Sequence, residues 1–397
     1  MRAHYLYFVV LPGLCTALPV QDGGFISQFP VHTTNGADGS IIDWVPVNSQ
    51  VDDDDEVAAA PELPSIIALS ASSSNQTSLI PQPITAEEHI GLEGTVPVVR
   101  QYGRLPDIKA PPQTINSSFA QQIHIGKRAI GDHWYASSAQ NVVNHGGSAT
   151  YSLYKAYTES NADFSLLQSA VIKYNVKNPL YNDPNRVAMQ TVEAGWINYP
   201  NQVSAPHLFI YYTTNGYTTS ANNQGGWNRD VTGWVQVDSS IYPGVSFTPL
   251  STRGGAQYDI KIQWLLYQGN WWLFVLDRWI GYYPASLFGA NTDVSKSLQV
   301  GADAINYYGE IYDSHQSLTK TDMGSGTFPD KGYGQSAYIR NMVYTNSNGQ
   351  DQKYDGSKGI VVSDTNRYRM SADWSGSESW GSYMYLGGPG AGGQIGA

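Results

Sequence analysis

The chain has 397 residues, of which 41% are hydrophobic, so it can bury one large core or two modest ones. Only 14% of the residues are charged, whereas 28 Tyr, 11 Trp, 40 Gly and 21 Pro are typical of strands joined by tight turns. The formal net charge is −11, and residues 18–125 carry −10 of it, with 3 Lys or Arg against 13 Asp or Glu. The part after residue 125 is nearly neutral without a basic cluster, which argues against nucleic-acid binding.

Residues 1–17 have the pattern of a cleavable secretory signal peptide. Arg2 is followed by an apolar run over 5–14 and by the small residues of 15–17. We therefore expect a secreted, extracellular protein without a membrane anchor, because no later stretch approaches about eighteen continuous apolar residues. Cys15 is the only cysteine, so the exported chain is expected to lack disulfides. Asn75 and Asn116 begin Asn-x-Ser/Thr sequences and are candidate glycosylation sites of a glycoprotein.

Residues 18–122 differ in composition from the rest of the chain. An Asp/Glu run occupies 52–56, an Ala/Ser-rich stretch follows over 57–77, and 105–112 is rich in Pro. This pattern predicts a small, loosely folded acidic leader that ends in an exposed linker. The acidic run alone is equally well explained as the solvated face of an ordinary domain.

From residue 123 to residue 397, apolar and polar residues alternate in runs separated by Gly, Asn and Pro. The runs 206–214, 233–241, 258–267, 271–280 and 335–345 are predicted strands. Residues 268–270 (QGN) have the length and composition of a hairpin connection, and a helix is expected only near 284–290. We predict an all-β fold, an antiparallel β-sandwich.

Common catalytic motifs are absent from the sequence. It has no Gly-x-Ser-x-Gly, no His-Glu-x-x-His, no Asp-Thr/Ser-Gly and no cysteine outside 1–17. A Ser/His/Asp triad stays open, although nothing in the sequence favours it. The histidines of 123–397 lack metal-ligand spacing, and we interpret each as a surface or hydrogen-bonded residue: His133, His145, His207 and His315. We expect no metal and no cofactor.

Glutamate is scarce after residue 122, where it occurs only at positions 159, 193, 310 and 378. Glu193 and Glu310 lie in short β-like runs beside a glycine and aromatic residues. On a strand, Glu193 shares a face with Thr191, and Glu310 shares one with Tyr308 and Tyr312. Two carboxyl groups facing each other would have separated pKa values, one acting as acid and one as base, as water-mediated hydrolysis requires. Considered alone, these contexts fit exposed or ion-paired strand glutamates as well.

Short motifs along most of the chain resemble the neprosin family, secreted peptidases with two glutamates on a β-sandwich. In the leader they are 38–45 (DGSIIDWV) and 93–100 (EGTVPVVR). In the remainder they are 164–168 (FSLLQ), 192–196 (VEAGW), 208–214 (LFIYYTT), 257–259 (QYD), 269–272 (GNWW), 281–284 (GYYP), 309–310 (GE), 323–326 (MGSG) and 387–389 (GGP). The two catalytic glutamates of the family fall on Glu193 and Glu310.

The resemblance implies a zymogen. Residues 18–122 would be an activation propeptide that inhibits the catalytic domain, 123–397, and we expect acid to release it as its carboxylates become protonated below roughly pH 4. The enzyme would be a monomeric glutamic endopeptidase that cuts peptides or proteins after proline at acid pH. Trp196, Tyr212 and Tyr308 are candidate substrate contacts. Plant members carry disulfides in this domain, whereas this chain has none after Cys15.

Two other functions remain open at this stage. A lectin-like carbohydrate-binding sandwich would also show aromatic residues such as Trp271, Trp272 and Trp279 beside polar strands. A glycosidase could use the same two carboxyl groups. An activation signature favours the peptidase, because a binding module has little need of an inhibitor.

Overall fold

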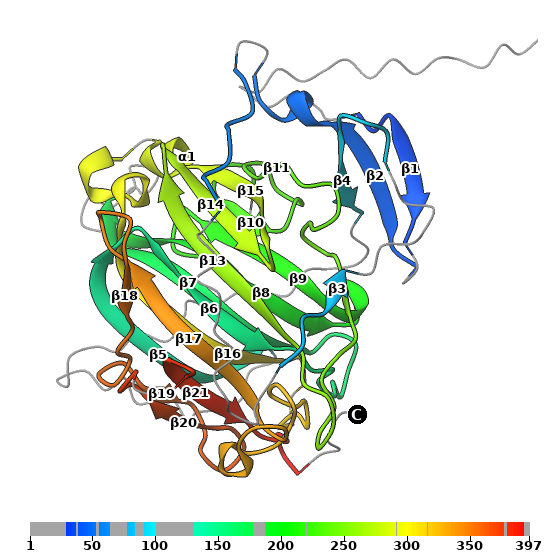
Figure 1. Cartoon of the computed structure of the whole chain (residues 1–397), viewed down its shortest axis with the longest axis vertical. Coiled ribbons are helices and arrows are strands. Elements are labelled where there is room, and N and C mark those ends of the chain that lie inside the picture. Colours follow the sequence, from blue (N-terminus) through cyan, green and yellow to red (C-terminus); the bar gives the residue numbers. More distant parts are fainter. Residues whose placement is uncertain are drawn as a thin grey trace, which may run out of the picture.

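The computed structural model describes residues 29–36, 39–52, 55–63, 78–83, 91–100, 131–177, 187–218, 221–290, 292–315, 317–376 and 379–392. Within these ranges the chain is almost entirely strands and turns, and the strands form two large antiparallel sheets and two small ones (Figure 1). The helical pieces are short: η1 (Val47–Gln50), α1 (Ser286–Gly289), η2 (Val294–Lys296), η3 (Leu298–Val300) and η4 (Pro329–Lys331). Among the described residues, no helix has the length and apolar character needed to cross a membrane.

The first large sheet has seven strands, all antiparallel to their neighbours. Their order is β10 (Gly225–Trp227), β9 (Val203–Thr213), β8 (Val187–Tyr199), β7 (Phe164–Lys177), β16 (Ala302–Asp313), β5 (Asp132–Asn144) and β19 (Val361–Val362). Because β16 lies between β7 and β5, segments that are far apart in the sequence form the centre of this sheet.

The second large sheet has nine strands. Their order is β11 (Val235–Gln236), β15 (Arg278–Pro284), β14 (Asn270–Val275), β13 (Asp259–Tyr267), β6 (Gly146–Ser152), β17 (Ala337–Thr345), β21 (Ser382–Gly387) and β20 (Arg369–Asp373), and β18 (Asp351–Lys353) also pairs with β17. The predicted hairpin joins β13 to β14. Its Gln268 and Gly269 have φ of 47° and 76°, as a two-residue hairpin turn with positive φ at both positions requires.

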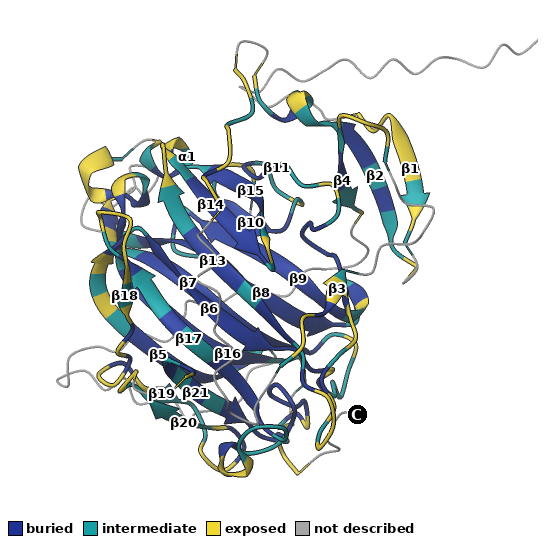
Figure 2. Ribbon diagram, viewed as in Figure 1, coloured by how far each residue is buried: buried dark blue, intermediate teal, exposed yellow. Residues whose placement is uncertain are grey.

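The main hydrophobic core lies between the two large sheets (Figure 2). On β8 the side chains of Val192, Ala194 and Trp196 point into this core, so the alternating Glu193 points to the outer face of the first sheet. The predicted all-β, antiparallel sandwich is confirmed. The runs 206–214, 258–267 and 335–345 correspond to β9, β13 and β17, and the helix expected near 284–290 is the single turn α1.

Two strand predictions are wrong in detail. The run 271–280 is not one strand, because Leu276 adopts a φ of 60° and ends β14, and β15 then begins at Arg278. The run 233–241 contains only the two-residue strand β11, because the Asp238 carboxylate accepts hydrogen bonds from the amides of Ser240 and Ile241 and forms a turn there.

The described N-terminal residues form a small sheet of β1 (His32–Asn35), β2 (Ile41–Pro46) and β4 (Thr95–Val99), beside the two large sheets in Figure 1. A short strand, β3 (Gln82–Pro83), pairs with β12 (Phe247–Thr248). Several predictions fall outside the described residues and stay predictions: the signal peptide at 1–17, the linker at 105–122, the boundary between 122 and 123, and the sites Asn75 and Asn116.

Candidate active site

Glu193 and Glu310 are on strands β8 and β16, which flank β7. Glu193 pairs with Ala170 of β7, and Glu310 pairs with Leu166, four residues earlier on the same strand. Gln168 lies midway between these two positions and shares their face of the sheet. Glu193 is 2% exposed and Glu310 is 4% exposed. The fold therefore brings the two predicted glutamates to one buried patch on the outer face of the first sheet.

Three hydroxyl groups donate hydrogen bonds to the Glu193 carboxylate. Oε1 accepts from Thr191 Oγ1 at 2.7 Å and from Tyr217 OH at 2.5 Å, and Oε2 accepts from Tyr308 OH at 3.2 Å. Tyr217 has a φ of 62°, which is uncommon for a bulky residue, and its ring stacks on Tyr211. This backbone conformation places the Tyr217 hydroxyl on the carboxylate.

Glu310 has a different set of partners. His133 Nδ1 lies 2.5 Å from Glu310 Oε1, and Tyr135 OH lies 3.5 Å from the same oxygen. Gln168 Nε2 donates to Glu310 Oε2 at 3.4 Å and to Tyr308 OH at 2.5 Å. Since Tyr308 in turn donates to Glu193, a continuous chain of hydrogen bonds joins the two carboxyl groups.

The surroundings of Glu193 shift its pKa upward. Burial raises the pKa of Glu193 to about 7, the negative charge of Glu310 acts in the same direction, and the hydrogen bonds from Tyr217, Thr191 and Tyr308 only partly oppose it. Glu193 is therefore mostly protonated at acid pH. Burial, together with the nearby carboxylates, also raises the pKa of Tyr308 and Tyr217 well above the ordinary value, so both remain neutral hydrogen-bond donors.

Close approach of β8 to β7 depends on Gly195. A Cβ at this position would lie 2.7 Å from both Cα and Cβ of Gln168 and 2.0 Å from the Leu167 carbonyl oxygen. Gly195 therefore lets the two strands approach where Gln168 reaches toward Tyr308. Two groups of buried hydrophobic side chains extend over this face beside the glutamates. The first is mostly aromatic: Phe164, Leu166, Ile197, Tyr199, Phe209, Tyr211 and Trp227. The second is mostly aliphatic: Tyr135, Ala170, Ile172, Met189, Ala304 and Tyr308.

Several buried polar atoms at the patch have no hydrogen-bond partner among the described residues. They are Gln168 Oε1, His133 Nε2, Ser137 Oγ and both polar atoms of the Asn306 side chain. Ser137 pairs with Tyr308 in the sheet, and Asn306 is two residues before Tyr308, so both share the face of the glutamates. Buried polar groups are nearly always hydrogen-bonded in folded proteins. These atoms are suited to bind water or the polar groups of a ligand.

Of the predicted substrate contacts, only Tyr308 lies beside the glutamates. Trp196 and Tyr212 are fully buried in the core between the two sheets. Trp196 Nε1 donates to the Ser152 carbonyl of the other sheet at 2.8 Å, and Tyr212 OH donates to the Thr232 carbonyl at 2.7 Å. Because both side chains point away from the face of the glutamates, we withdraw them as candidate substrate contacts.

Four side chains of the patch were not predicted as part of it: His133, Tyr135, Gln168 and Tyr217. His133 was predicted to be a surface or hydrogen-bonded histidine, and it is buried and hydrogen-bonded to Glu310. Gln168 lies within one of the motifs that resemble the neprosin family, which is the signal that could have indicated it. Tyr217 lies in the turn after β9, where strand alternation does not indicate which way a side chain points.

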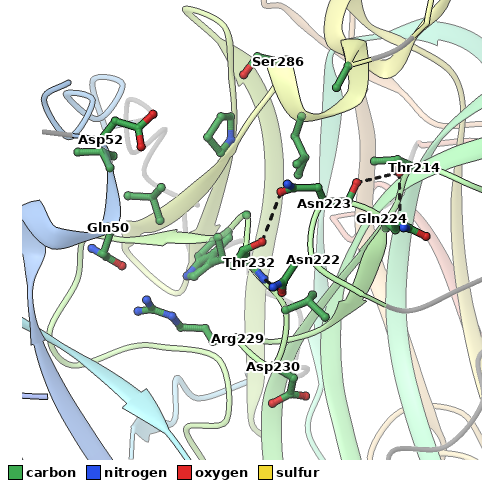
Figure 3. A pocket seen from close by; sticks show the side chains of 18 of the residues that line it. Gln50, Asp52, Thr214, Asn222, Asn223, Gln224, Arg229, Asp230, Thr232 and Ser286 are labelled. Carbon is green, nitrogen blue, oxygen red and sulfur yellow. Dashed lines mark hydrogen bonds between the residues drawn. The ribbon is translucent and has the colours of Figure 1, made fainter. Parts of the chain in front are cut away.

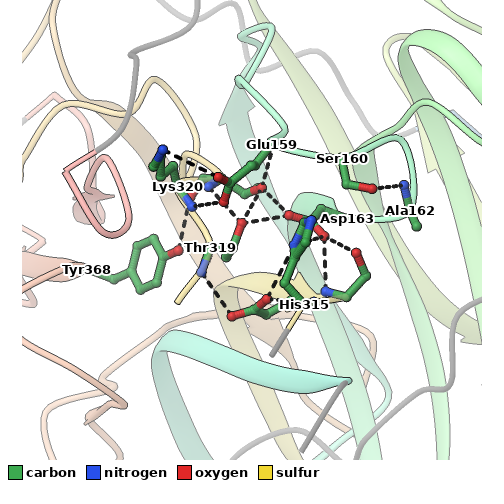
Figure 4. Close-up of polar contacts among 11 residues, drawn as sticks. Glu159, Ser160, Ala162, Asp163, His315, Thr319, Lys320 and Tyr368 are labelled. Carbon is green, nitrogen blue, oxygen red and sulfur yellow. Dashed lines mark hydrogen bonds and ion pairs between the residues drawn. The ribbon is translucent and has the colours of Figure 1, made fainter. Parts of the chain in front are cut away.

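A second cluster of ionisable groups lies at the ends of β7 and β16 (Figure 4). Potential ligand atoms of Asp163, Asp313 and His315 lie within 4.8 Å of one another. The Asp163 carboxylate, however, already accepts hydrogen bonds from Ser314, Thr319 and Thr321. This pattern explains the buried aspartate without a metal ion, and it ties the loop after β16 to the start of β7. Glu159 and Lys320 form a partly exposed ion pair nearby.

The large cavity of the structure is not at the glutamates. About 840 Å³ of space separates the N-terminal residues from the loops around β11, and neither Glu193 nor Glu310 lines it. Figure 3 shows Gln50 and Asp52 on one side of this cavity and Asn222 and Thr232 on the other. The candidate site is therefore defined by its network of hydrogen bonds rather than by the size of a cavity.

Two antiparallel sheets with a linked, buried pair of carboxyl groups on one outer face define a β-sandwich protein with a carboxyl-pair site. The family model Neprosin matches residues 161–389, which is more than half of the chain and includes both glutamates. The chain belongs to the neprosin family, and the resemblance inferred from the sequence is confirmed. Membership in this family supports the interpretation of the protein as a peptidase.

Weak structural similarity to two solved peptidases was also found. One is SCP-B, a member of the eqolisin family of peptidases, in complex with the tripeptide Ala-Ile-His, at 9% identity and a TM-score of 0.31. The other is scytalido-glutamic peptidase with a peptide-based transition-state analogue, at 8% identity and a TM-score of 0.30. Each alignment covers 64% of this chain and 98% of the other. At these TM-scores the similarity carries no argument about the chemistry.

Proposed function

We propose that the protein is a glutamic peptidase in which Glu193 is the general acid and Glu310 is the general base. The observation that carries this proposal is the buried, hydrogen-bonded pair in which the pKa of Glu193 is raised to about 7. A pair of carboxyl groups with separated pKa values can hold one proton and accept another at the same pH. Hydrolysis of an amide needs both actions.

The reaction would begin with a water molecule hydrogen-bonded to Glu310. Glu310 takes a proton from this water as its oxygen attacks the carbonyl carbon of the peptide, and protonated Glu193 gives its proton to the carbonyl oxygen. The resulting tetrahedral intermediate breaks its C–N bond while Glu310 returns a proton to the leaving nitrogen, and Glu193 recovers its proton from the oxygen. Gln168 and Tyr308 hold the two carboxyl groups in position.

We further propose an endopeptidase that cuts after proline. Membership in the neprosin family supports this preference, since cleavage after proline is what the resemblance to that family implies. As part of the same proposal, the protein is made as a secreted zymogen with residues 18–122 as its propeptide. It acts as a monomer on peptides or proteins and needs no cofactor.

No described feature favours the carbohydrate-based alternatives. Trp271 lies in the core between the sheets, and Trp272 and Trp279 are covered by other side chains, so none of them offers an exposed aromatic face to a sugar. The peptidase remains the function that the geometry supports best.

The test uses purified protein from which the leader has been removed. Casein and a panel of polysaccharides are incubated with it between about pH 3 and about pH 8, a range that includes the raised pKa of Glu193. We expect cleavage of casein at acid pH, new C-termini enriched in proline by mass spectrometry, and no effect of chelators or of thiol- and serine-directed reagents. Full inhibition by a chelator, or cleavage of a polysaccharide but not of casein, would reject the proposal. Products without proline enrichment would reject only the specificity.

A further inference from the structure

The outer face of the second sheet carries an aromatic cluster that the proposed chemistry does not use. Side chains alternate along β14, where Trp271 and Leu273 point into the main core and Trp272 and Phe274 point outward. Together with Val235, Trp279 and Tyr282, the outward pair forms a separate hydrophobic cluster. Trp272 is 0% exposed and Trp279 is 5% exposed although both are on an outer face. Another part of the chain must therefore cover them.

The cover is a segment of the N-terminal region, residues 47–52 and 55–63, which we call the strap. Its side chains Val51, Val57 and Ala58 pack against the aromatic cluster. Two hydrogen bonds accompany this packing. The Ala58 amide donates to Tyr282 OH at 3.1 Å, and Trp279 Nε1 donates to the Glu62 carbonyl at 3.4 Å.

Gln50 attaches the beginning of the strap to the edge of the second sheet. Its Nε2 donates to the Gln236 carbonyl at 2.7 Å, and its Oε1 accepts from the Gln236 amide at 2.9 Å. Gln236 belongs to β11, the outermost strand, so the amide side chain of Gln50 satisfies backbone groups as a neighbouring strand would. Gln50 is itself only 5% exposed, which is uncommon for glutamine and consistent with a fixed contact.

The strap contacts lie far from the candidate active site and are made by uncharged groups. The glutamates are on the outer face of the first sheet, whereas the strap lies on the outer face of the second, so the core separates them. The amide of Gln50, the backbone groups and the apolar side chains described above do not titrate between acid and neutral pH. The strap also carries Asp52, Asp55, Glu56 and Glu62, and the Asp55 carboxylate acts electrostatically on Tyr282. Acid therefore changes the charge beside these contacts, but it leaves the contacting groups themselves unchanged.

We propose that the strap is an anchor that binds an exosite, the aromatic cluster and the β11 edge, and keeps the N-terminal region attached after the chain is cut within residues 101–130. The partner of this surface is thus the protein's own leader, held as a non-covalent complex at acid as well as neutral pH, in place of the release by acid that is expected from the sequence. The inference rests on the proposed division into leader and enzyme, and it is independent of the catalytic roles of the glutamates.

The experiment cuts the full chain at one chosen place. A recognition sequence for an unrelated protease is inserted within 101–130 of the Glu193→Gln protein, so that the protein's own proposed activity cannot contribute. After cutting, size-exclusion chromatography at about pH 7 and about pH 4 follows the N-terminal fragment, because these values lie above and near the pKa of its carboxylates. We expect the fragment to co-elute with the body at both pH values.

Matched variants test whether the strap is responsible. Gln50→Ala combined with Val57→Asp should release the fragment at least about tenfold faster, whereas Val31→Asp, an equal change at an exposed residue of the same region, should not. If the double variant fails to fold, Val57→Ala is compared with Val31→Ala for the same change in rate. Immediate loss of the wild-type fragment at neutral pH, or equal retention in strap and control variants, would overturn the proposal. Because the readout is binding, failure of the peptidase proposal leaves this test intact.

Discussion

His133 Nδ1 lies 2.5 Å from Glu310 Oε1, and both side chains are almost fully buried. Glu193 has no such nitrogen partner among its described contacts and instead accepts hydrogen bonds from the hydroxyls of Thr191, Tyr217 and Tyr308. Glu310 thus has a ring nitrogen as a partner, and an imidazole N–H can donate a hydrogen bond to a carboxylate. This asymmetry supports Glu310 as the base and Glu193 as the acid.

The role of His133 as a positioning residue predicts different effects for two replacements. His133→Phe removes the donor to Glu310 and should lower kcat about a hundredfold with little change in KM. The reason is that Glu310 loses its orientation, whereas the binding site of the substrate is unchanged. His133→Asn places an amide N–H near the position of Nδ1 and should recover at least about a tenth of the wild-type kcat. Steady-state kinetics on a peptide substrate distinguish the two variants. Equal losses in both, with intact circular dichroism spectra, would show that the hydrogen bond is not used.

The hydrogen bond from Tyr217 to Glu193 predicts how the pH profile of activity shifts when the hydroxyl is removed. Its hydrogen bond stabilises ionised Glu193 and so opposes the rise of that pKa to about 7. Removing the hydroxyl in Tyr217→Phe raises the pKa further, so the protonated acid persists to higher pH. Activity of the wild type should fall as pH rises toward neutral, and the alkaline limb of the Tyr217→Phe profile should lie at higher pH. A limb that moves to lower pH would contradict the assignment of Glu193 as the acid.

Burial of Glu193 predicts a stability change that does not depend on activity. The pKa is raised from 4.5 to about 7 in the folded state, so the contribution of the protonated group to stability is fully present below about pH 4.5 and is lost as pH rises through about 7. Glu193→Gln should therefore unfold at the same temperature as the wild type at about pH 4, and be more stable above pH 7 by up to the order of 3 kcal/mol. Thermal unfolding at the two pH values measures this difference. An equal difference in stability between Glu193→Gln and the wild type at both pH values would show that Glu193 does not titrate in this range.

The small N-terminal sheet should respond to acid in the opposite sense. Partial burial acts to raise the pKa of Asp43, but hydrogen bonds from Arg100 and Thr33 outweigh it and hold the pKa below its usual value. The stability from this pair is present above about pH 4 and is lost as pH falls through the lowered pKa. The protection factors of amides in β2 and β4, corrected for the intrinsic exchange rate at each pH, should fall in acid, while those of the strap amides should not. In Asp43→Asn the difference in amide protection between acid and neutral pH should be smaller than in the wild type. An unchanged difference in protection would exclude the pair of Asp43 and Arg100 as its cause.

Local sequence patterns predicted the sheets and the direction of the glutamates, because alternation decides which side chains face the core. They could not predict the network around the glutamates, since it depends on pairing between distant segments. His133 meets Glu310 because β5 pairs with β16, about 180 residues later in the chain. Gln168 lies between the glutamates only because β7 is the strand between β8 and β16. Trp196 lies three residues after Glu193 and faces the core, as strand alternation predicts, and this direction argues against its assignment as a substrate contact.

The end of β14 at residues 276–277 was not predicted for a similar reason. A β-hairpin with a Gly-containing loop was predicted at residues 268–270, where the composition indicates it. The turn between β14 and β15 has Leu276 at positive φ and no glycine, and only Asp277 and Arg278 interrupt the apolar residues of 271–280. Only the pairing of the two strands with each other reveals the break.

The replacement of single glutamates by glutamine tests the central claim most directly. Glu193→Gln and Glu310→Gln keep the shape of each side chain but can neither donate nor accept the catalytic proton, whereas Glu159→Gln changes a partly exposed glutamate paired with Lys320 outside the site. The measurement is kcat/KM on a proline-containing peptide, with circular dichroism as the control for folding. The proposed mechanism predicts a loss of at least about a thousandfold in each of the first two variants and near wild-type activity in Glu159→Gln. Substantial activity in folded Glu193→Gln or Glu310→Gln would contradict the assignment of this pair as the catalytic groups.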